Sequence, residues 1–555
     1  MKVPTGLTAL PLGGAGEIGM NFMVYECDGS LIVVDVGLSF PDEFAPGVDL
    51  VLPDIRYVRE NKHRLKAIII THAHEDHIGG LPYLWEDMPA PVYVSPFARL
   101  VLESKLDEVG LLGDVPIVGV KPGERFKVGP FDIEYIPVTH SIPESHALAI
   151  RTPYGNIVHT GDYKFDADPA LGAVTDEARL KAVGDEGVLA MFGDSTNVFK
   201  PNVAGSEGEV AKSLDSVIAG CKNRIFFCTF ASNLARVKTA ADLAARHGRK
   251  LALFGRSLHS MTGHARKLGY ISKELFETII SPEAAMDLPR NKVMFCVTGS
   301  QGEARAALNK LAAGEAGAMA LEAGDTVIFS SRIIPGNEKT IFALMNKLAR
   351  KGARIINEKS DFVHVSGHAA RDEIAKMYSL VRPQMAIPVH GEYQHMREQA
   401  DFAKSLGVPT QFVIENGDRV HLAPGTPKVT REAVEAGRNY VDGLSILDDD
   451  RFILRERRQL SLEGVATVTL ALDAQSGEIV AGPHIRTKGL IDEAVQEELL
   501  ATVADEVKDA LLTRFKKGVI SDIPHAEETM RQAVRRVFAR ERGRKPLTLT
   551  TVVSV

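Results

Sequence analysis

The chain of 555 residues lacks the features that mark secreted, membrane-spanning and metal-thiolate proteins. Its four cysteines are scattered without a Cys-x-x-Cys spacing, which argues against both a disulfide framework and a zinc-thiolate motif. No apolar run approaches the roughly 18 residues of a transmembrane helix. The N-terminal MKVPTGLTALPLGG has no basic segment followed by a long apolar stretch, as a secretory signal would. We therefore expect a cytoplasmic protein without membrane contact.

The chain also lacks the excess of basic residues that is typical of a nucleic-acid-binding protein. Its formal net charge is −7, whereas a domain that binds nucleic acid commonly carries a basic patch or stripe. If the substrate is a polyanion, the positive charge must be local, and two divalent cations in one cleft could supply it. The hydrophobic content of 45% and the charged content of 25% are ordinary for a soluble globular protein.

The first part of the chain is predicted to be rich in strands. Short apolar or alternating runs are separated by Gly, Asp and Asn, which is the pattern of strands joined by turns. The predicted strands are Leu7–Leu12, Asn21–Cys27, Leu31–Val36, Ala67–Thr71, Pro91–Val94, Ile117–Val120, Phe131–Val138, Ala147–Arg151, Asn156–Thr160 and Val188–Phe192. Helices are expected near Leu81–Glu86 and Phe97–Val109.

From about residue 205 the predicted strands and helices alternate, which indicates a parallel α/β unit. The helices are Glu207–Ala219, Leu234–His247 and Ala304–Ala312; the strands are Arg224–Thr229, Lys250–Phe254, Lys292–Val297, Thr326–Ser330, Arg354–Asn357 and Gln384–Pro388. The tail forms a module of its own, with a hairpin (Val465–Leu472 and Glu478–Ala481), two helices (Asp492–Phe515 and Ala526–Arg540) and a last strand (Leu547–Val555).

The run His72-Ala73-His74-Glu75-Asp76-His77 is the strongest chemical signal in the sequence. It follows the apolar residues Ile68–Ile70, so it occupies a loop at the end of a buried strand, where functional residues often lie. In an extended segment the His-x-His spacing places both imidazoles on one side. Imidazole and carboxylate groups suit zinc and also manganese. Four potential ligands within six residues favour a metal site over a set of unrelated histidines.

Three more potential ligands follow predicted strands. They are His140, Asp162 and His390. Each alone could be an ordinary polar residue at a strand end. Together with the first cluster they supply the seven or so positions that a pair of metal ions needs, which predicts a two-metal hydrolase.

The motif Thr71-His72-Ala73-His74-Glu75-Asp76-His77 resembles the signature of the metallo-β-lactamase superfamily, a four-layer αββα sandwich. Asp194 in Phe-Gly-Asp-Ser-Thr-Asn, His368 in Val-Ser-Gly-His-Ala, and His390 resemble the nucleic-acid-processing β-CASP branch. Within that branch the chain is most similar to the ribonuclease J family, and four stretches carry the likeness. They are Leu12–Asn21, Phe230–Asn233, Thr298–Glu303 and Pro388–Glu392.

The resemblance implies an α/β (α+β) fold with five successive parts. Residues 1–205 would form the first part of a metallo-β-lactamase domain, 206–355 an inserted β-CASP α/β domain, and 356–430 the second part of the first domain. Residues 431–455 would be a linker with the polar run Asp448–Asp450, and 456–555 a small C-terminal α/β domain.

The resemblance also implies a role for each site residue. One metal ion would be held by His72, His74, His140 and Asp162. The other would be held by Asp76, His77, Asp162 and His390, with Asp162 bridging. Zn²⁺ is the first expectation, with Mn²⁺ or Mg²⁺ as alternatives.

The remaining roles complete the expected site. The catalytic residues would be His368, Asp194 and Asp76, with His368 protonating the leaving 3′-oxygen and Asp194 orienting it. Asp35 would accept the second ring N–H of a metal-bound histidine. A pocket for a substrate phosphate would comprise His364, Ser366, Gly367, His368 and Ser232.

The expected activity is cleavage of single-stranded RNA, as a 5′-to-3′ exonuclease that prefers 5′-monophosphate ends and as an endonuclease, in RNA maturation and decay. A DNA nuclease of the same branch is an alternative, although such members typically lack a histidine at the position of His390. A non-nucleolytic hydrolase of the same fold and a non-catalytic scaffold are further alternatives. The family resemblance also implies a homodimer or homotetramer, with partners in an RNA-degradation complex.

The spacing Gly14-x-Gly16-x-x-Gly19 matches a dinucleotide-binding fingerprint, but its context does not. That fingerprint opens a helix, whereas the residues after Gly19 predict another strand. We interpret it as a glycine-rich turn near the active site.

Overall fold

The computed structural model describes residues 5–41, 45–317, 319–334, 336–443, 445–447, 451–492, 496–515 and 519–555. It divides into two compact units. The first comprises Met1–Ser39 and Leu52–Gly437, and the second comprises Phe40–Val51 and Arg438–Val555. Among the described residues, no helix combines the length and the apolar character that crossing a membrane requires.

Two large sheets form the centre of the first unit. The order of the first is β24 (Lys428–Thr430), β23 (Arg419–Ala423), β1 (Leu7–Gly13), β3 (Phe22–Cys27), β4 (Ser30–Val34), β6 (Leu65–Ile69), β7 (Val92–Val94) and β8 (Ile117–Gly119). The order of the second is β22 (Thr410–Gln411), β20 (Met385–Val389), β13 (Ala190–Asp194), β12 (Gly155–His159), β11 (Ser145–Thr152), β10 (Phe131–Val138) and β9 (Arg125–Val128).

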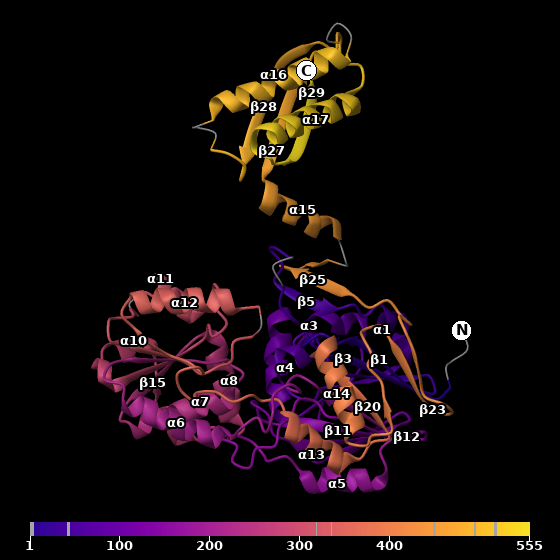
Figure 1. Cartoon of the computed structure of the whole chain (residues 1–555), viewed down its shortest axis with the longest axis vertical. Coiled ribbons are helices and arrows are strands. Elements are labelled where there is room, and N and C mark those ends of the chain that lie inside the picture. Colours follow the sequence, from indigo (N-terminus) through magenta and orange to yellow (C-terminus); the bar gives the residue numbers. More distant parts are fainter. Residues whose placement is uncertain are drawn as a thin grey trace. The chain divides into compact units, whose positions relative to one another are not determined.

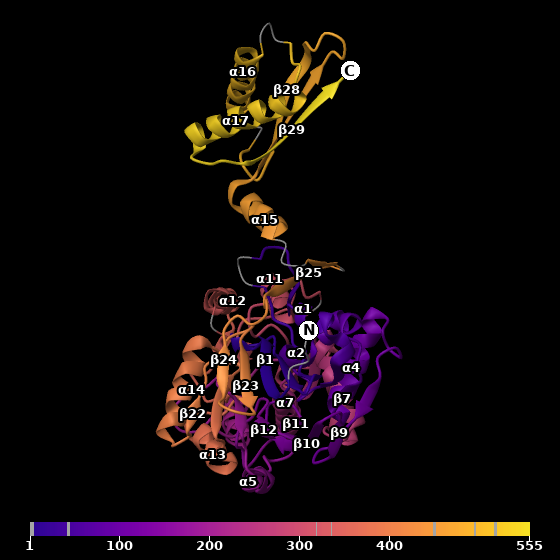
Figure 2. The same cartoon turned by 90° about the vertical axis from the view of Figure 1, so that its right-hand side faces the viewer.

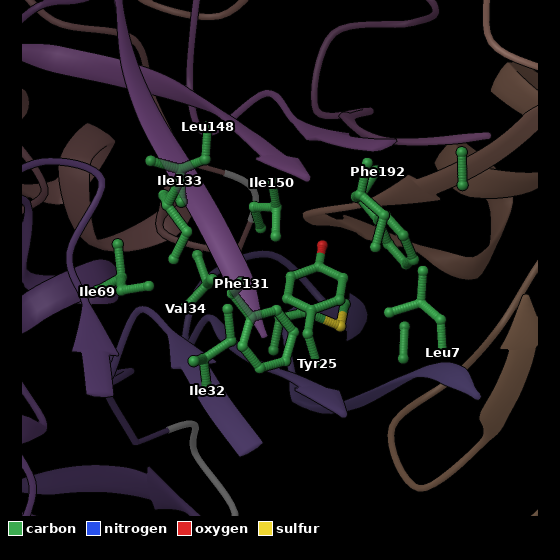
Figure 3. Packing of buried hydrophobic residues seen from close by; sticks show 14 of the residues in the cluster. Leu7, Tyr25, Ile32, Val34, Ile69, Phe131, Ile133, Leu148, Ile150 and Phe192 are labelled. Carbon is green, nitrogen blue, oxygen red and sulfur yellow. The ribbon is translucent and has the colours of Figure 1, made fainter. Parts of the chain in front are cut away.

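The two sheets pack face to face around one apolar core. Along each strand, alternate side chains point into this core, as the period of two in a strand requires. Figure 3 shows the result, with Tyr25, Ile32 and Ile69 from the first sheet near Phe131 and Ile150 from the second. All five side chains are fully buried. At ~25 cal/mol per Å², burial of this apolar surface is the main stabilising contribution to the sandwich.

Helices cover the outer faces of the sandwich. The second sheet packs against α5 (Glu177–Glu186), α13 (Arg371–Val381) and α14 (Tyr393–Ser405) through a second apolar cluster. On the first sheet, α4 (Pro96–Val109) contacts β7 and β8. The short helices of this part are α1 (Arg56–Glu60), α2 (Glu75–Ile78) and α3 (Leu81–Leu84).

Between β13 and β20 the chain forms a separate six-stranded parallel sheet. Its order is β16 (Ile279–Ile280), β15 (Lys250–Phe254), β17 (Val293–Val297), β14 (Ile225–Cys228), β18 (Thr326–Phe329) and β19 (Arg354–Ile356). One face carries α6 (Glu207–Ala219), α7 (Leu234–Arg246), α8 (Arg256–Lys267) and α9 (Lys273–Glu277). The other carries α10 (Pro282–Met286), α11 (Ala307–Ala313) and α12 (Glu338–Arg350). Figure 1 shows α12 and α6 on opposite sides of this sheet.

The second unit contains a smaller sheet with both of its long helices on one side (Figure 2). The sheet order is β28 (Ile479–Lys488), β27 (Val465–Leu472) and β29 (Leu547–Ser554), and the helices are α16 (Glu497–Arg514) and α17 (Ile523–Arg542). It is preceded by the hairpin of β25 (Arg438–Asp442) and β26 (Ser445–Leu447) and by α15 (Arg451–Glu463). Strand β5 (Leu50–Pro53) lies where the chain passes from one unit to the other.

The α/β fold class expected from the sequence is confirmed, and the differences in detail are local. Helix α11 begins at Ala307 rather than Ala304, and β28 extends to Lys488 rather than Ala481. The expected linker 431–455 contains the hairpin β25–β26 and the start of α15, which its polar composition concealed. The run Asp448–Asp450 lies outside the described residues.

A buried ion pair stabilises the inserted domain. Arg236 of α7 is fully buried and donates to both carboxylate oxygens of Glu207, at the start of α6. The same guanidinium donates to Ser330 Oγ and to the carbonyl oxygen of Val363, each at 2.6 Å. It therefore joins two helices to the end of β18 and to the segment that leads back into the sandwich.

Replacing Arg236 by alanine should lower the free energy of unfolding of the inserted domain by about 3–5 kcal/mol, because Glu207 would remain buried without a counter-charge. Calorimetric melting of the full chain measures this effect. Arg246→Ala is the matched control, because Arg246 ends the same helix in an exposed pair with Asp215, a kind worth about 1 kcal/mol or less. Equal effects of the two substitutions would contradict the assignment.

Candidate metal centre

The potential ligands of the first unit converge because they follow the ends of neighbouring strands. Strands β12, β13 and β20 are parallel neighbours, so their carboxyl ends meet at one edge of the second sheet. Asp162, Asp194 and His390 lie at or just after these ends. His140 follows β10 of the same sheet, and the His72–His77 run follows β6 of the facing sheet. The site therefore lies where edges of both sheets meet.

The first potential metal-binding group consists of His72, His74, His140 and Asp162. The Nδ1 atom of His74 lies 3.0 Å from His72 Nε2 and 3.1 Å from His140 Nε2. Three ring nitrogens thus point at one small volume. Burial, as the main cause, holds the pKa of each of these histidines below its ordinary value. They are therefore neutral near pH 7, which is the form that coordinates a metal ion.

The second group consists of Asp76, His77, Asp162 and His390. Asp162 belongs to both groups, and its Oδ2 atom lies close to histidine nitrogens of each group. Its Oδ2 lies 3.2 Å from His77 Nε2, 3.6 Å from His390 Nε2, 3.7 Å from His72 Nε2 and 3.8 Å from His140 Nε2. Asp76 Oδ2 completes the group, 3.6 Å from His77 Nε2.

These distances fit divalent metal ions. Donor atoms that share a tetrahedral ion at the usual zinc–nitrogen bond length lie about 3.4 Å apart. The separations given above, 3.0–3.8 Å, bracket that value, and within each group all donor atoms lie within 4.8 Å of one another. The donor set is imidazole nitrogen and carboxylate oxygen, which suits zinc and manganese. Both groups therefore have the chemistry and the spacing of divalent metal sites.

The electrostatics of the second group also favour cations. Burial works to lower the pKa of His77, but Asp162, Asp76 and Asp35 outweigh it and hold the pKa well above its ordinary value. Burial works to raise the pKa of Asp162, but His390 and His77 outweigh it and hold the pKa well below its ordinary value. Three carboxylates around one buried imidazole create a negative potential, and a divalent cation would neutralise it.

Hydrogen bonds on the opposite ring nitrogens fix how three of the histidines face the centre. Asp35 Oδ2 lies 2.7 Å from His77 Nδ1, which is the arrangement that its predicted role requires. His140 Nδ1 donates to the carbonyl oxygen of Gly367 at 2.7 Å. His390 Nδ1 lies 2.9 Å from Asn21 Oδ1. Each of these three contacts is made at Nδ1 and lets Nε2 face the metal centre, as partners of metal-bound histidines commonly do.

The sequence interpretation missed Asn21 and Thr71 as functional residues and gave Gly367 a different role. Asn21 contacts His390 through Oδ1, while its Nδ2 donates to the carbonyl oxygen of Asp76 and lies 3.0 Å from His77 Nε2. Thr71 donates from both its backbone N–H and its Oγ1 to Asp35. Both residues stand in the quoted motifs, but only the fold shows what they touch.

Local backbone conformation adds to this arrangement. Asp35 and His390 have φ values of +64° and +52°, which lie in a backbone region that residues other than glycine seldom adopt. The N–H of His390 donates to the carbonyl oxygen of Gly14, and the turn 14–19 pairs with the segment after His390 through β2 (Ala15–Gly16) and β21 (Gly391–Glu392). The glycine-rich turn lies beside the metal centre, since Gly14 contacts His390. Strand β3 follows the turn in the chain, as the sequence predicted.

Next to the two groups the buried carboxylate of Asp194 pairs with the half-buried imidazole of His368. Asp194 Oδ2 accepts from His368 Nδ1 at 2.8 Å, and its Oδ1 accepts from the N–H and Oγ1 of Thr196. Burial works to lower the pKa of His368, but Asp194 and Asp162 outweigh it and raise the pKa to about 9. A protonated His368 is a potential proton donor at neutral pH.

The expected phosphate-pocket residues come from two parts of the first unit. His364, Ser366, Gly367 and His368 lie on the segment between β19 and α13, and Ser366 Oγ accepts from the N–H of His368. Ser232 stands two residues before α7, and Arg236 of that helix donates to the carbonyl oxygen of Val363. The fold thus links the two parts through Arg236.

Comparisons with known proteins decide the family. Residues 16–215 match the family model "Metallo-beta-lactamase superfamily", 222–348 "Ribonuclease J, beta-CASP domain", 353–413 "Zn-dependent metallo-hydrolase RNA specificity domain", and 452–555 "Ribonuclease J C-terminal domain". A ribonuclease J of Sinorhizobium meliloti is 42% identical, over 99% of this chain and 97% of the relative. One of Thermus thermophilus is 37% identical, over 98% and 94%.

The chain belongs to the ribonuclease J family. The resemblance predicted from the sequence motifs is thereby confirmed. A solved structure, described as a protein of unknown function from Enterococcus faecalis V583, shares the fold with a TM-score of 0.50 at 17% identity and covers 74% of this chain and 99% of its own.

In this ribonuclease J family member, Asn21→Ala should weaken divalent metal binding about 10- to 100-fold, because His390 loses the partner that holds its ring at Nδ1. Titration of the metal-free protein with Zn²⁺ or Mn²⁺ measures the affinity. Asn61→Ala is the control, because Asn61 directly follows helix α1 and its side chain donates to the carbonyl oxygen of Tyr57 in that helix. Unchanged metal affinity in Asn21→Ala would contradict the orienting role.

Proposed function

We propose that the chain is a metal-dependent ribonuclease that hydrolyses phosphodiester bonds in single-stranded RNA. The observation that carries the proposal is the convergence of two metal-binding groups on Asp162, beside the His368–Asp194 pair. The match of residues 353–413 to an RNA specificity domain supports RNA as the substrate, as do relatives named ribonuclease J.

In this proposal each predicted site residue has one task. His72, His74, His140 and Asp162 would hold one divalent ion, and Asp76, His77, Asp162 and His390 the other. Divalent ions held there would supply an activated water and would stabilise charge on the phosphate. His368 would give its proton to the leaving 3′-oxygen, while Asp194 holds its ring in place. Asp35 would keep His77 oriented.

We further propose that His364, Ser366, Gly367, His368 and Ser232 form a pocket for a 5′-monophosphate. The ring nitrogen Nδ1 of His364 is buried and has no hydrogen-bond partner among the described residues. Such an orphaned polar atom costs free energy unless a ligand or a water molecule satisfies it. Capture of the 5′ end would give 5′-to-3′ exonuclease action, and binding of internal segments would give endonuclease action.

The proposed function also includes a metal ion, a cellular location and an oligomeric state. Zn²⁺ is the first choice of ion, with Mn²⁺ or Mg²⁺ next, because imidazole and carboxylate ligands dominate both groups. We propose action in RNA maturation and decay in the cytoplasm, as a homodimer or homotetramer with partners in an RNA-degradation complex. We also propose that the chain divides into five parts, with boundaries at residues 205, 355, 430 and 455.

A substrate panel tests the proposed function. The purified chain, supplied with Zn²⁺ or Mn²⁺, is incubated with one RNA sequence that carries a 5′-monophosphate, 5′-triphosphate or 5′-hydroxyl end, and with the matching DNA strand. RNA should be cut, fastest from the monophosphate end, and DNA should not. Cleavage of DNA at the same rate would favour a DNA nuclease of this fold. Absence of RNA cleavage would refute the proposed function.

A second test separates His368 from the metal ligands. His368→Ala should keep both metal ions and lower kcat about 10²- to 10⁴-fold, because the leaving oxygen loses its proton donor. Metal content by mass spectrometry and single-turnover cleavage measure the two effects. His247→Ala is the matched control, since His247 pairs with Asp215 in the inserted domain. Loss of metal from His368→Ala would overturn the proton-donor role.

A further inference from the structure

Arg332 of the inserted domain reaches toward the segment that carries the proposed pocket. It follows β18, in a loop that Gln301 holds on both sides. Gln301 Nε2 donates to the carbonyl oxygen of Arg332 at 2.8 Å, and Gln301 Oε1 accepts from the N–H of Ile334 at 2.9 Å. Since the Gln301 side chain is buried, these two bonds fix the loop and hence the direction of Arg332.

The guanidinium of Arg332 is linked to the pocket through one side chain. Its Nη1 donates to Asn197 Oδ1 at 2.9 Å, and Asn197 Nδ2 donates to Ser366 Oγ at 2.7 Å and to the carbonyl oxygen of His368 at 3.0 Å. Asn197 therefore stands between Arg332 and the pocket segment, and it places the cation of one domain beside polar groups of the other.

Four cations act electrostatically on His364, whose buried Nδ1 has no hydrogen-bond partner among the described residues. Burial first, and then Arg236, Arg332, Lys200 and Lys164, hold its pKa well below the ordinary value. A neutral imidazole with one unsatisfied buried nitrogen near positive charges suits an anion site, because an anion would satisfy that nitrogen and the cations together.

Of these four cations, Arg332 alone is exposed and donates few hydrogen bonds to the fold. The other three donate to groups of the fold, namely Glu207 for Arg236, Asp166 for Lys164 and the carbonyl oxygen of Ala204 for Lys200. Among the residues that the structure describes, Arg332 donates from its guanidinium to Asn197 alone, and its side chain is exposed. It retains N–H groups that can bind a ligand.

We propose that Arg332 is a specificity-determining residue that binds the 5′-terminal phosphate of the RNA from the inserted domain, opposite Ser366 and His364, and that Gln301 is its positioning residue. The inference rests on the proposed function. A planar guanidinium binds two phosphate oxygens at once and always carries its charge, so it suits a terminal phosphate better than a hydroxyl end.

The test compares Arg332→Gln with the parent protein on two RNAs of one sequence, which differ only in a 5′-monophosphate or a 5′-hydroxyl end. The affinity for the monophosphate RNA should fall about 10- to 100-fold, the range expected for loss of a charged hydrogen bond. The affinity for the hydroxyl RNA should stay within about twofold, and the plot of log affinity against log salt for the monophosphate RNA should lose about 0.7 in slope. Arg350→Gln, an exposed arginine at the end of α12, is the control and should change neither RNA.

Two outcomes overturn the proposal. Equal weakening on both RNAs would place Arg332 on an internal phosphate. A fall in kcat on both RNAs with unchanged affinity would mean that Arg332 only supports Asn197 and His368. A parent protein that cuts no RNA would instead refute the proposed function, so the two failures are distinguishable.

A double-mutant cycle tests the role of Gln301. Gln301→Ala should give the same selective loss on monophosphate RNA, and Arg332→Gln should show no further effect in the Gln301→Ala background. Additive losses would overturn the positioning role. Arg332→Lys, which keeps the charge without the planar fork, should restore part of the salt dependence and little of the end preference.

Discussion

The site depends on one buried carboxylate oxygen. Asp162 Oδ2 lies within 3.8 Å of four histidine nitrogens that come from three separate strand ends. A buried charge at such a point is costly unless opposite charge compensates it. Divalent cations on either side would compensate it, and the same arrangement lets one residue serve both ions. The proposed chemistry, the spacing of the ligands and the negative potential of the centre all follow from this shared atom.

The rest of the first unit holds that geometry in place. Parallel pairing of β12, β13 and β20 brings three strand ends to one edge, and the facing sheet supplies the His72–His77 run. Asn21, Asp35 and the carbonyl oxygen of Gly367 bind the far side of the ligand rings, so the imidazoles are oriented before any ion binds. The inserted domain then adds Arg332 on the substrate side.

Much of this could be predicted from the sequence, because strand periodicity and dense ligand motifs are local signals. The strand Phe131–Val138 and the helix Glu207–Ala219 have the bounds that their patterns predicted. Helix α15 was missed, because polar residues concealed its helical pattern. The contacts of Asn21, Gly367 and Arg332 could not be read from the chain, because their partners stand between 135 and 369 positions away. Such contacts are set by the packing of domains.

The most direct test of the shared carboxylate is a crystal structure of the metal-loaded chain, with anomalous scattering recorded at the absorption edge of the bound metal. The account predicts two anomalous peaks, one among His72, His74 and His140 and one among Asp76, His77 and His390, with the Asp162 carboxylate contacting both. A single peak, or two peaks of which only one contacts Asp162, would contradict it.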